Sequence, residues 1–415
     1  MTDLPLLSAD GILTRVPLNA APGFVRPAGA LRSRVAYAAA HVVPKTHADN
    51  TPGQPADIDW DATLAFRRHV YGWGLGVADA MDTAQRNMGL DAAATRELIA
   101  RSAEVAREEG GSVVVGVNTD HVDDERISLA QVIDAYTEQL HFTEEQGAGP
   151  VLMASRHLAR VAQSADDYRR VYRAVLQAAT TPVVLHWLGT AFDPQLEGYF
   201  GSTDWREAGD VLLDIIGDNA GKVAGVKMSL LNAESEVSVR SRLPEGVRMF
   251  TGDDFNYVGL IGGDSLAPVP EHAPVPELVE GSVAERAPVP ELVEGSHSDA
   301  LLGAFAALTP VASAAIQALD AGEPARYLDI LGPTEELSRQ VFAAPTFYYK
   351  TGVAFLSWLN GHQPAFQMVG GLHSARSLPH LSRIVELANA SHALEQPDLA
   401  AARWSDLLRV NGVDG

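Results

Sequence analysis

Short apolar runs, rich in valine and alanine, recur between residues 34 and 310, each bounded by glycine, proline or aspartate. They cover residues 34–43, 76–81, 112–120, 149–155, 182–189, 223–229, 247–254 and 300–309. Helix-like stretches separate them, and residues 90–110 and 164–181 have the spacing of amphipathic helices. Strands that alternate with helices pair in parallel, and right-handed crossovers place every helix on the same outer side. The pattern therefore predicts an α/β fold, a closed (β/α)8 or TIM barrel.

An open, doubly wound sheet is the alternative for such a pattern. That fold commonly carries a glycine-rich phosphate loop between a strand and a helix. Here the glycine-rich segment Gly72–Gly76 precedes a predicted strand instead, so the closed barrel is favoured.

One segment departs from the pattern, because the decapeptide APVPELVEGS occurs twice, at Ala273–Ser282 and Ala287–Ser296. Ala267–Glu271 resembles its first half. A sequence this rich in proline and glutamate buries too little apolar surface to order itself, and two copies are too few for a stacked repeat fold. We predict a disordered insertion over residues 265–297, and expect that deleting Ala267–Ser296 leaves fold and activity nearly intact.

The chain has 415 residues, whereas a bare barrel needs about 250, so part of it must lie outside the barrel. The pattern becomes helical beyond residue 310, most clearly at 380–395. We therefore expect an N-terminal extension (1–33), a barrel (34–310) and a C-terminal helical region packed on it (311–415).

Composition narrows the chemistry. The chain has 31 lysines and arginines and 53 aspartates and glutamates. The resulting net charge of −22 would repel nucleic acids and anionic membranes. Cysteine is absent, which removes thiolate nucleophiles, Cys-zinc sites and iron–sulfur clusters. The N-terminus lacks the basic segment and long apolar run of a secretion signal, so we expect a cytoplasmic protein.

Lys227 is the strongest catalytic candidate. In the run VAGVKMS, alternation puts Gly225, Lys227 and Ser229 on one face and the apolar Val226 and Met228 on the other. The apolar pair suits the helix layer, which leaves Lys227 pointing into the barrel. Burial lowers the pKa of a lysine and frees the neutral amine that a Schiff-base enzyme needs. The alternative is a lysine whose ammonium reaches solvent or pairs with Asp253 or Asp254.

Other polar residues fall at the ends of predicted strands, where the catalytic groups of barrels gather. His186 lies within an apolar strand, where it could carry a proton or simply bond a carbonyl group. Asp253 ends the run 247–254, and we interpret the adjacent Asp254 as a cap or turn residue. The remaining candidates of this kind are Asp79, Asp82, Thr83, Asn118 and Asp120.

These residues resemble a known group, the dihydrodipicolinate synthase and N-acetylneuraminate lyase superfamily of barrel aldolases, and more closely its dihydrodipicolinate-synthase-like bacterial branch. The similarity runs from about residue 34 to 310. VAGVKMS is similar to the family strand whose lysine forms the Schiff base, which implies that role for Lys227. RMFTGDD and GVNTD resemble two further family strands, and they carry Asp253 and Asn118.

Two departures bear on the substrate. Where the family has Gly-Thr-Thr-Gly-Glu to bind a keto-acid carboxylate, this chain has Met81, Asp82, Thr83, Ala84 and Gln85. Asp82 would repel a carboxylate. Where the family has a proton-relaying tyrosine, this chain has His186. These changes argue against pyruvate and favour a hydroxylated, sugar-derived ketone or aldehyde, bound by Asp82, Thr83, Gln85, Asn118 and Asp253.

The leading hypothesis is a lyase or aldolase in which Lys227 forms a Schiff base and His186 moves a proton, with no cofactor and no metal. One alternative is a metal-dependent sugar lyase or isomerase that uses Asp79, His186, Asp253, His41 or His157. Another is a non-catalytic sugar-binding barrel. A homo-oligomer is also expected, because residues 355–359 include an apolar face that could form a subunit interface. The alternative is that this face covers the barrel within one chain.

Overall fold

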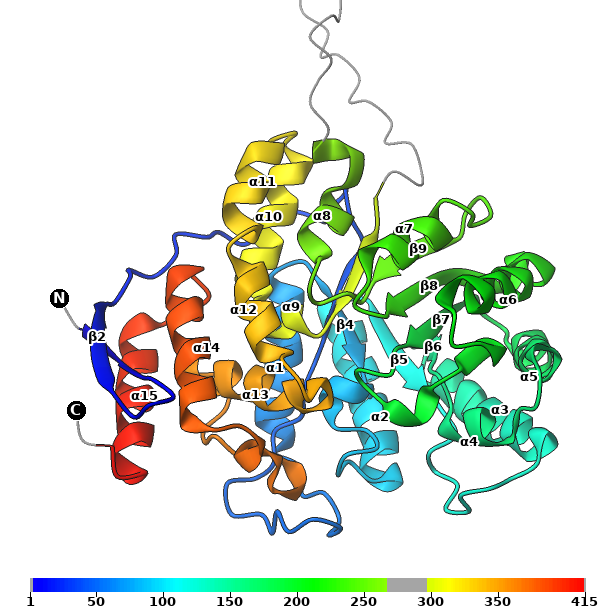
Figure 1. Ribbon diagram of the computed structural model, residues 1–415, viewed down its shortest axis with the longest axis horizontal. Helices are drawn as coiled ribbons and strands as arrows, with labels where there is room; N and C mark the ends of the chain where they lie inside the picture. The colour runs from blue at the N-terminus through cyan, green and yellow to red at the C-terminus, as the bar shows by residue number, and fades with distance from the viewer. Residues whose placement is uncertain (1–2, 267–296, 414–415) are drawn as a thin grey trace, which may run out of the picture.

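The computed structural model describes residues 3–266 and 297–413, and its centre is a closed barrel of eight parallel strands (Figure 1). The strands are β3 (Ala36–Ala39), β4 (Gly76–Asp79), β5 (Val113–Val117), β6 (Gly149–Leu152), β7 (Val183–Leu188), β8 (Val223–Ser229), β9 (Arg248–Thr251) and β10 (Asp299–Leu302). Each strand pairs with the next, and β10 closes onto β3. Every predicted run overlaps one of these strands, so the predicted TIM barrel is confirmed.

Helices cover the outside of the barrel. They are α1 (Trp60–Gly72), α2 (Ala92–Glu109), α3 (Leu129–Glu145), α4 (Arg156–Val161), α5 (Ala165–Ala178), α6 (Trp205–Asp218), α7 (Ala233–Arg240), α8 (Tyr257–Gly262), α9 (Ala304–Ala307) and α10 (Thr309–Asp320). Asp91 begins α2 by accepting a hydrogen bond from the backbone N–H of Ala94, and Gly110 ends it with a φ of 62°. No helix within the described ranges is long and apolar enough to cross a membrane.

Strand alternation divides the core into two layers. Apolar side chains fill the barrel interior, among them Ala39, Ala78, Val114, Val151, Val184, Phe250 and Leu301. The residues between them point outward and pack against the helices. The last predicted run is strand only to Leu302, because the chain turns at Gly303 into the short helix α9.

The C-terminal helices are α11 (Pro324–Leu331), α12 (Thr334–Val341), α13 (Tyr349–Leu359), α14 (Leu378–Ala390) and α15 (Pro397–Val410). They share one apolar core with the barrel, since Phe355 and Trp404 belong to the same buried cluster as Leu302. Phe355, Leu356 and Leu359 are fully buried within the chain. The apolar face at 355–359 therefore covers the barrel and does not form an exposed subunit interface.

The N-terminal extension contains a hairpin that the sequence pattern did not predict, β1 (Asp3–Leu7) paired with β2 (Leu13–Pro17). It packs on the C-terminal helices, so that both chain ends lie on the same side of the molecule (Figure 1). The backbone N–H of Leu7 donates to Ser382 Oγ at 2.7 Å, and Trp404 Nε1 donates to the carbonyl of Pro5 at 2.7 Å. The predicted insertion falls almost wholly outside the described residues, which resume at His297.

Candidate active site

Lys227 lies on β8 and is buried inside the barrel. Val226 and Met228 belong to the apolar layer under the helices, so the side chains alternate as the sequence predicted. Burial lowers the pKa of Lys227 below its ordinary 10.5, although the carboxylates of Asp82 and Asp254 act in the opposite direction. The result is an amine that loses its proton more readily than a surface lysine and has two acidic neighbours.

Because Gly252 has no side chain, the Lys227 side chain can pass close to its backbone. A Cβ built on Gly252 would lie 2.8 Å from Lys227 Cε, 2.2 Å from Ser229 Oγ and 2.8 Å from the carbonyl oxygen of Met228. Its backbone N–H also donates to that carbonyl at 2.7 Å, which extends the pairing of β9 with β8. Only glycine fits at this position without displacing the lysine.

The carboxylate that approaches Lys227 after β9 belongs to Asp254. Alternation from Phe250 through Gly252 points Asp254 inward, where it accepts a hydrogen bond from the backbone N–H of Ala304 at 3.0 Å. Burial raises the pKa of Asp254 to about 7, while the Ala304 N–H and Lys227 act against that rise. Asp254 thus binds the backbone N–H of the first residue of α9, whose N-cap is Gly303, and also shares the site with the lysine.

Asp253, the predicted substrate ligand, is committed to its own loop. Its Oδ1 accepts from the backbone N–H of Phe255, and its Oδ2 accepts from Asn256 Nδ2, both at 2.9 Å. It comes between Gly252 and Asp254, which face inward, and its charge acts on Glu236 of α7. We therefore do not retain it as a substrate ligand.

Asp82 and Thr83 begin a short 3-10 helix after β4 (η1, Asp82–Ala84). Asp82 is half-buried and its charge acts on Lys227. Thr83 Oγ1 shares a 2.7 Å hydrogen bond with the phenol of Tyr349, at the start of α13. Burial, with the charges of Asp82 and Asp254, raises the pKa of Tyr349 well above its ordinary value, so the phenol stays protonated. A C-terminal residue therefore reaches the mouth of the barrel.

A second buried lysine follows Tyr349. Lys350 Nζ donates to the carbonyl of Phe347 at 2.9 Å and lies 4.6 Å from the centroid of the Tyr349 ring. Burial lowers the pKa of Lys350 to about 8, while Asp82 and Asp193 oppose this and Arg156 adds to it. Arg156 Nε in turn donates to Asp193 Oδ2 at 2.6 Å. The mouth thus combines two amines of lowered pKa with several carboxylates.

His186 faces the interior of the barrel beside Lys227, its register partner on β8. Its Nε2 lies 3.1 Å from Ser229 Oγ, and its buried Nδ1 has no hydrogen-bond partner. Burial, and then the charge of Lys227, lower the pKa of His186 well below 6.5. The ring is therefore neutral at physiological pH.

The other predicted ligands divide into two groups. Asn118 lines a pocket at the mouth, and its Oδ1 accepts from the backbone N–H of Thr119 at 2.7 Å. Gln85 instead ties η1 to the C-terminal region: its Nε2 donates to the carbonyl of Val369 at 2.7 Å, and its Oε1 accepts from the Val369 N–H at 3.1 Å. Its amide is fully engaged, so we do not retain Gln85 as a substrate ligand.

The residues of the metal-dependent alternative are not brought together, which corrects that hypothesis. Asp79 points into the helix layer, where Arg67 donates two hydrogen bonds to it at 2.8 and 3.0 Å. His41 bonds Gln363 at 3.1 Å, and His157 bonds Thr119 at 2.8 Å. In the described part of the chain, these residues form no cluster with metal-ligand spacing.

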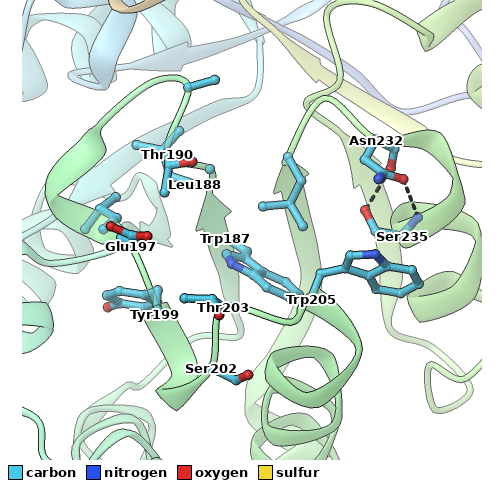
Figure 2. Close-up of a pocket in the computed structure, with 15 residues that line it drawn as sticks. Trp187, Leu188, Thr190, Glu197, Tyr199, Ser202, Thr203, Trp205, Asn232 and Ser235 are labelled. Atoms are coloured by element: carbon cyan, nitrogen blue, oxygen red, sulfur yellow. Dashed lines mark hydrogen bonds between the residues drawn. The ribbon is translucent and has the colours of Figure 1, made fainter.

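Two pockets lie near the strand ends. The first, about 160 Å³, is lined by Asp82, Asn118, Arg156, His157 and Asp193 among others. The second, about 290 Å³, lies between the loop after β7 and the start of α6 (Figure 2). Trp187, Trp205 and Asn232 line it, and Asn232 caps α7 by accepting from the Ser235 N–H at 3.0 Å. Lys227 lines neither pocket, but Asp82, whose charge acts on Lys227, lines the first, so we place the chemistry beside that pocket.

Sequence reasoning gave Asp254 only as a cap residue or an ion-pair partner of Lys227, and it missed Tyr349 and Lys350. The period of two that placed Lys227 also points Asp254 inward, so that signal was available. Tyr349 and Lys350 come from a helix more than one hundred residues after Lys227, and no local pattern connects them to the site.

A family model described as "Protein of unknown function (DUF993)" matches residues 4–413. No curated protein matches the sequence. Among solved structures, a dihydrodipicolinate synthase from Aquifex aeolicus is similar, with a TM-score of 0.60 and 12% identity over 88% of this chain and 99% of that one. A putative dihydrodipicolinate synthetase from Pseudomonas aeruginosa has a TM-score of 0.58 and 15% identity, covering 86% and 98%. At these identities the likeness establishes the fold alone.

Proposed function

Since this chain belongs to the DUF993 family and its barrel has the fold of the dihydrodipicolinate synthases, we propose that it is a Schiff-base-forming lyase or aldolase acting on a carbonyl compound. The observation that carries the proposal is Lys227, buried in the barrel with its pKa lowered and with Asp82 and Asp254 as acidic neighbours. A cation is costly to bury, and a neutral amine at a strand end of a barrel is a nucleophile ready for a carbonyl carbon.

The steps follow from these groups. Lys227 Nζ adds to the carbonyl carbon, and loss of water leaves an iminium ion. A substrate C–C bond then breaks, its electron pair passes into the iminium to form an enamine, and the other fragment leaves as an aldehyde or ketone. Protonation of the enamine carbon and hydrolysis release the second product and restore the amine. In a dehydratase, loss of a β-hydroxyl would replace the C–C cleavage.

Asp254 is the better proton carrier. With a pKa of about 7 it exists in both forms near neutral pH, which suits general acid–base catalysis. His186 has a pKa well below 6.5, so its protonated form is scarce at that pH. We assign His186 to positioning Ser229 and Lys227, and the Tyr349 phenol to hydrogen-bond donation at the mouth.

The substrate class follows from charge. A keto acid would place its carboxylate next to the carbonyl carbon, close to Asp82 and Asp254, which would repel it. Hydroxyl groups can instead donate hydrogen bonds to both carboxylates. We therefore favour a hydroxylated, sugar-derived ketone or aldehyde over pyruvate. A homo-oligomeric state and a cytoplasmic location remain predictions.

Borohydride trapping tests the proposal. The full chain is incubated with dihydroxyacetone, glyceraldehyde or pyruvate, reduced, and examined by intact mass and peptide mapping. We expect a stable adduct on Lys227 that is lost in Lys227→Ala and kept in Lys350→Met and in the surface control Lys45→Ala. Adducts that persist unchanged in Lys227→Ala would contradict the mechanism.

Two other outcomes are informative. Greater labelling of Lys227 by pyruvate than by dihydroxyacetone would overturn the substrate class and leave the Schiff base intact. Sugar binding without any adduct, unchanged in Lys227→Ala, would establish the non-catalytic sugar-binding barrel instead.

A further inference from the structure

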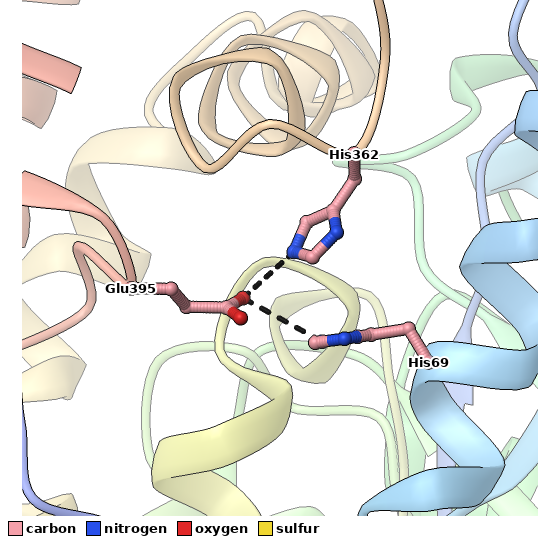
Figure 3. A group of neighbouring side chains, drawn as sticks. All are labelled: His69, His362 and Glu395. Carbon is pink, nitrogen blue, oxygen red and sulfur yellow. Dashed lines mark hydrogen bonds and ion pairs between the residues drawn. The ribbon is translucent and has the colours of Figure 1, made fainter. Parts of the chain in front are cut away.

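Two histidines and a glutamate meet where the C-terminal region packs on the barrel wall (Figure 3). His69 belongs to α1, His362 follows α13, and Glu395 precedes α15. One ligand atom from each residue lies within 4.8 Å of the other two. Three segments that are distant in sequence thus bring potential metal-binding atoms close together.

The contacts within this cluster are incomplete without a further partner. His362 Nε2 lies 2.8 Å from Glu395 Oε1, whereas His69 Nε2 lies 3.5 Å from the same oxygen. His69 Nε2 is buried and makes no hydrogen bond. The two imidazole rings are 4.2 Å apart, centroid to centroid. A buried ring nitrogen without a partner is costly, and an ion between the three side chains would satisfy it.

The backbone that carries the cluster is held by its own hydrogen bonds. Asn360 Nδ2 donates to the carbonyl of Ala393 at 2.9 Å, and Asn360 Oδ1 accepts from the Glu395 N–H at 2.9 Å. The His362 N–H donates to the carbonyl of Ser357 at 3.0 Å. His362 and Glu395 are therefore fixed relative to each other, opposite a histidine on a regular helix. Rigid supports of this kind favour metal binding.

We propose that His69, His362 and Glu395 bind one divalent transition-metal ion of the zinc class, with water as the fourth ligand. Two imidazoles and a carboxylate are a common three-residue ligand set for zinc. With metal–ligand bonds of about 2.0–2.2 Å, the ligand atoms of a tetrahedral site lie about 3.4 Å apart. Side-chain rotations that move the three ligand atoms by about 1 Å would give this geometry. The site lies on the helix layer, among residues that the proposed reaction does not use, and it joins the C-terminal region to α1.

Zinc binding to the full, tag-free chain tests this site. Protein stripped with a chelator is titrated with Zn²⁺ by calorimetry, and with Co²⁺ by visible absorption, which reports four-coordinate geometry. We expect one equivalent of Zn²⁺ per chain and, at a hundredfold excess over Kd, a rise in Tm of about 3 °C. His69→Gln and Glu395→Gln should each lower the affinity at least tenfold. The exposed His141→Gln is the matched control and should bind as the wild type does.

Substoichiometric binding by the wild type would overturn the site, and so would unchanged affinity in both ligand variants. The wild-type stoichiometry and the cobalt spectrum decide the question even if a variant fails to fold. The yield of the Lys227 adduct should not depend on Zn²⁺, so this test is independent of the proposed reaction.

Discussion

Gly252 controls the room available to Lys227. An alanine methyl there would meet Lys227 Cε and also the Met228 carbonyl, and the backbone atom cannot move aside. We expect Gly252→Ala to reduce borohydride adduct formation at least tenfold and to destabilise the fold by about 1–3 kcal/mol. Gly259→Ala is the control, because nothing beyond its own stretch of α8 lies within 4 Å of that Cβ; it should leave the adduct unchanged. If Gly252→Ala were labelled as strongly as the wild type, the Lys227 side chain would be able to react from another conformation.

Asp254 should govern the pH dependence of the reaction. In its ionised form it accepts a proton from the substrate carbon, so hydrogen–deuterium exchange into a bound ketone should rise with pH through about 7. Asp254→Asn should remove this inflection and slow the exchange by about 10²–10⁴-fold. Asp253→Asn, whose carboxylate is engaged by Phe255 and Asn256, should keep the wild-type profile. The same inflection in Asp254→Asn would assign the proton to another group.

The difference between these neighbours shows what the sequence can and cannot predict at this scale. Strand alternation predicts that Lys227 faces inward, and the same rule applied to Phe250 and Gly252 selects Asp254 over Asp253. It could not predict that Gln85 bonds Val369, because Val369 belongs to the C-terminal region, which is not paired with any strand of the barrel. Residue roles were predictable where a strand fixes direction and unpredictable where tertiary packing does.

At the scale of elements, α7 packs a buried carboxyl against the barrel. Glu236 Oε1 accepts from Ser298 Oγ at 2.7 Å, while Oε2 has no hydrogen-bond partner. Burial raises the pKa of Glu236 to about 7, although Ser298 and Thr251 oppose this. A carboxyl whose pKa is higher in the folded state takes up a proton on folding. Its contribution is fully present below about pH 4.5 and is lost as the pH rises through about 7.

Glu236→Gln should therefore alter how stability depends on pH. Relative to the variant, the wild type should lose about 1–3 kcal/mol of unfolding free energy between pH 5 and pH 8. Urea denaturation at the two pH values measures this difference. Glu234→Gln, exposed on the same helix, should follow the wild type. Parallel pH profiles of Glu236→Gln and the wild type would show that the carboxyl is already ionised when folded.

The barrel strands were predictable because each is an apolar run with turn residues at its ends. The β1–β2 hairpin was missed, although Asp10-Gly11 is a turn signal and Gly11 has a φ of 78°. Pro5 within β1 and the short length of both strands weaken the alternation. The hairpin packs on α14 and α15, and no local pattern reveals these contacts.

At the scale of the whole molecule, the C-terminal region and the barrel share one core. The helix after β10, α10, runs to Asp320, past the predicted boundary at 310. Beyond it, almost all of α13 is buried, and Phe355 contacts Trp404 with ring centroids 5.9 Å apart. A chain ending at residue 321 would expose the apolar surface that these helices cover.

We expect that shortened chain to aggregate or to lack a cooperative thermal transition, measured by circular dichroism and sedimentation. The full chain should melt in one transition. A soluble, cooperatively melting protein of residues 1–321 would show instead that the barrel folds alone and that the C-terminal region is a separate unit.

The hairpin at the N-terminus has a consequence for synthesis. Its strands leave the ribosome long before Ser382 and Trp404, which bond it, are made. At about 5–20 residues per second, the hairpin waits roughly 20 to 80 s for these partners. Its apolar side chains, including Leu4 and Leu6, are unprotected during that time. The hairpin can therefore dock fully only after residue 404 has been made, and a nascent chain stalled before residue 382 carries an exposed segment for chaperones to bind.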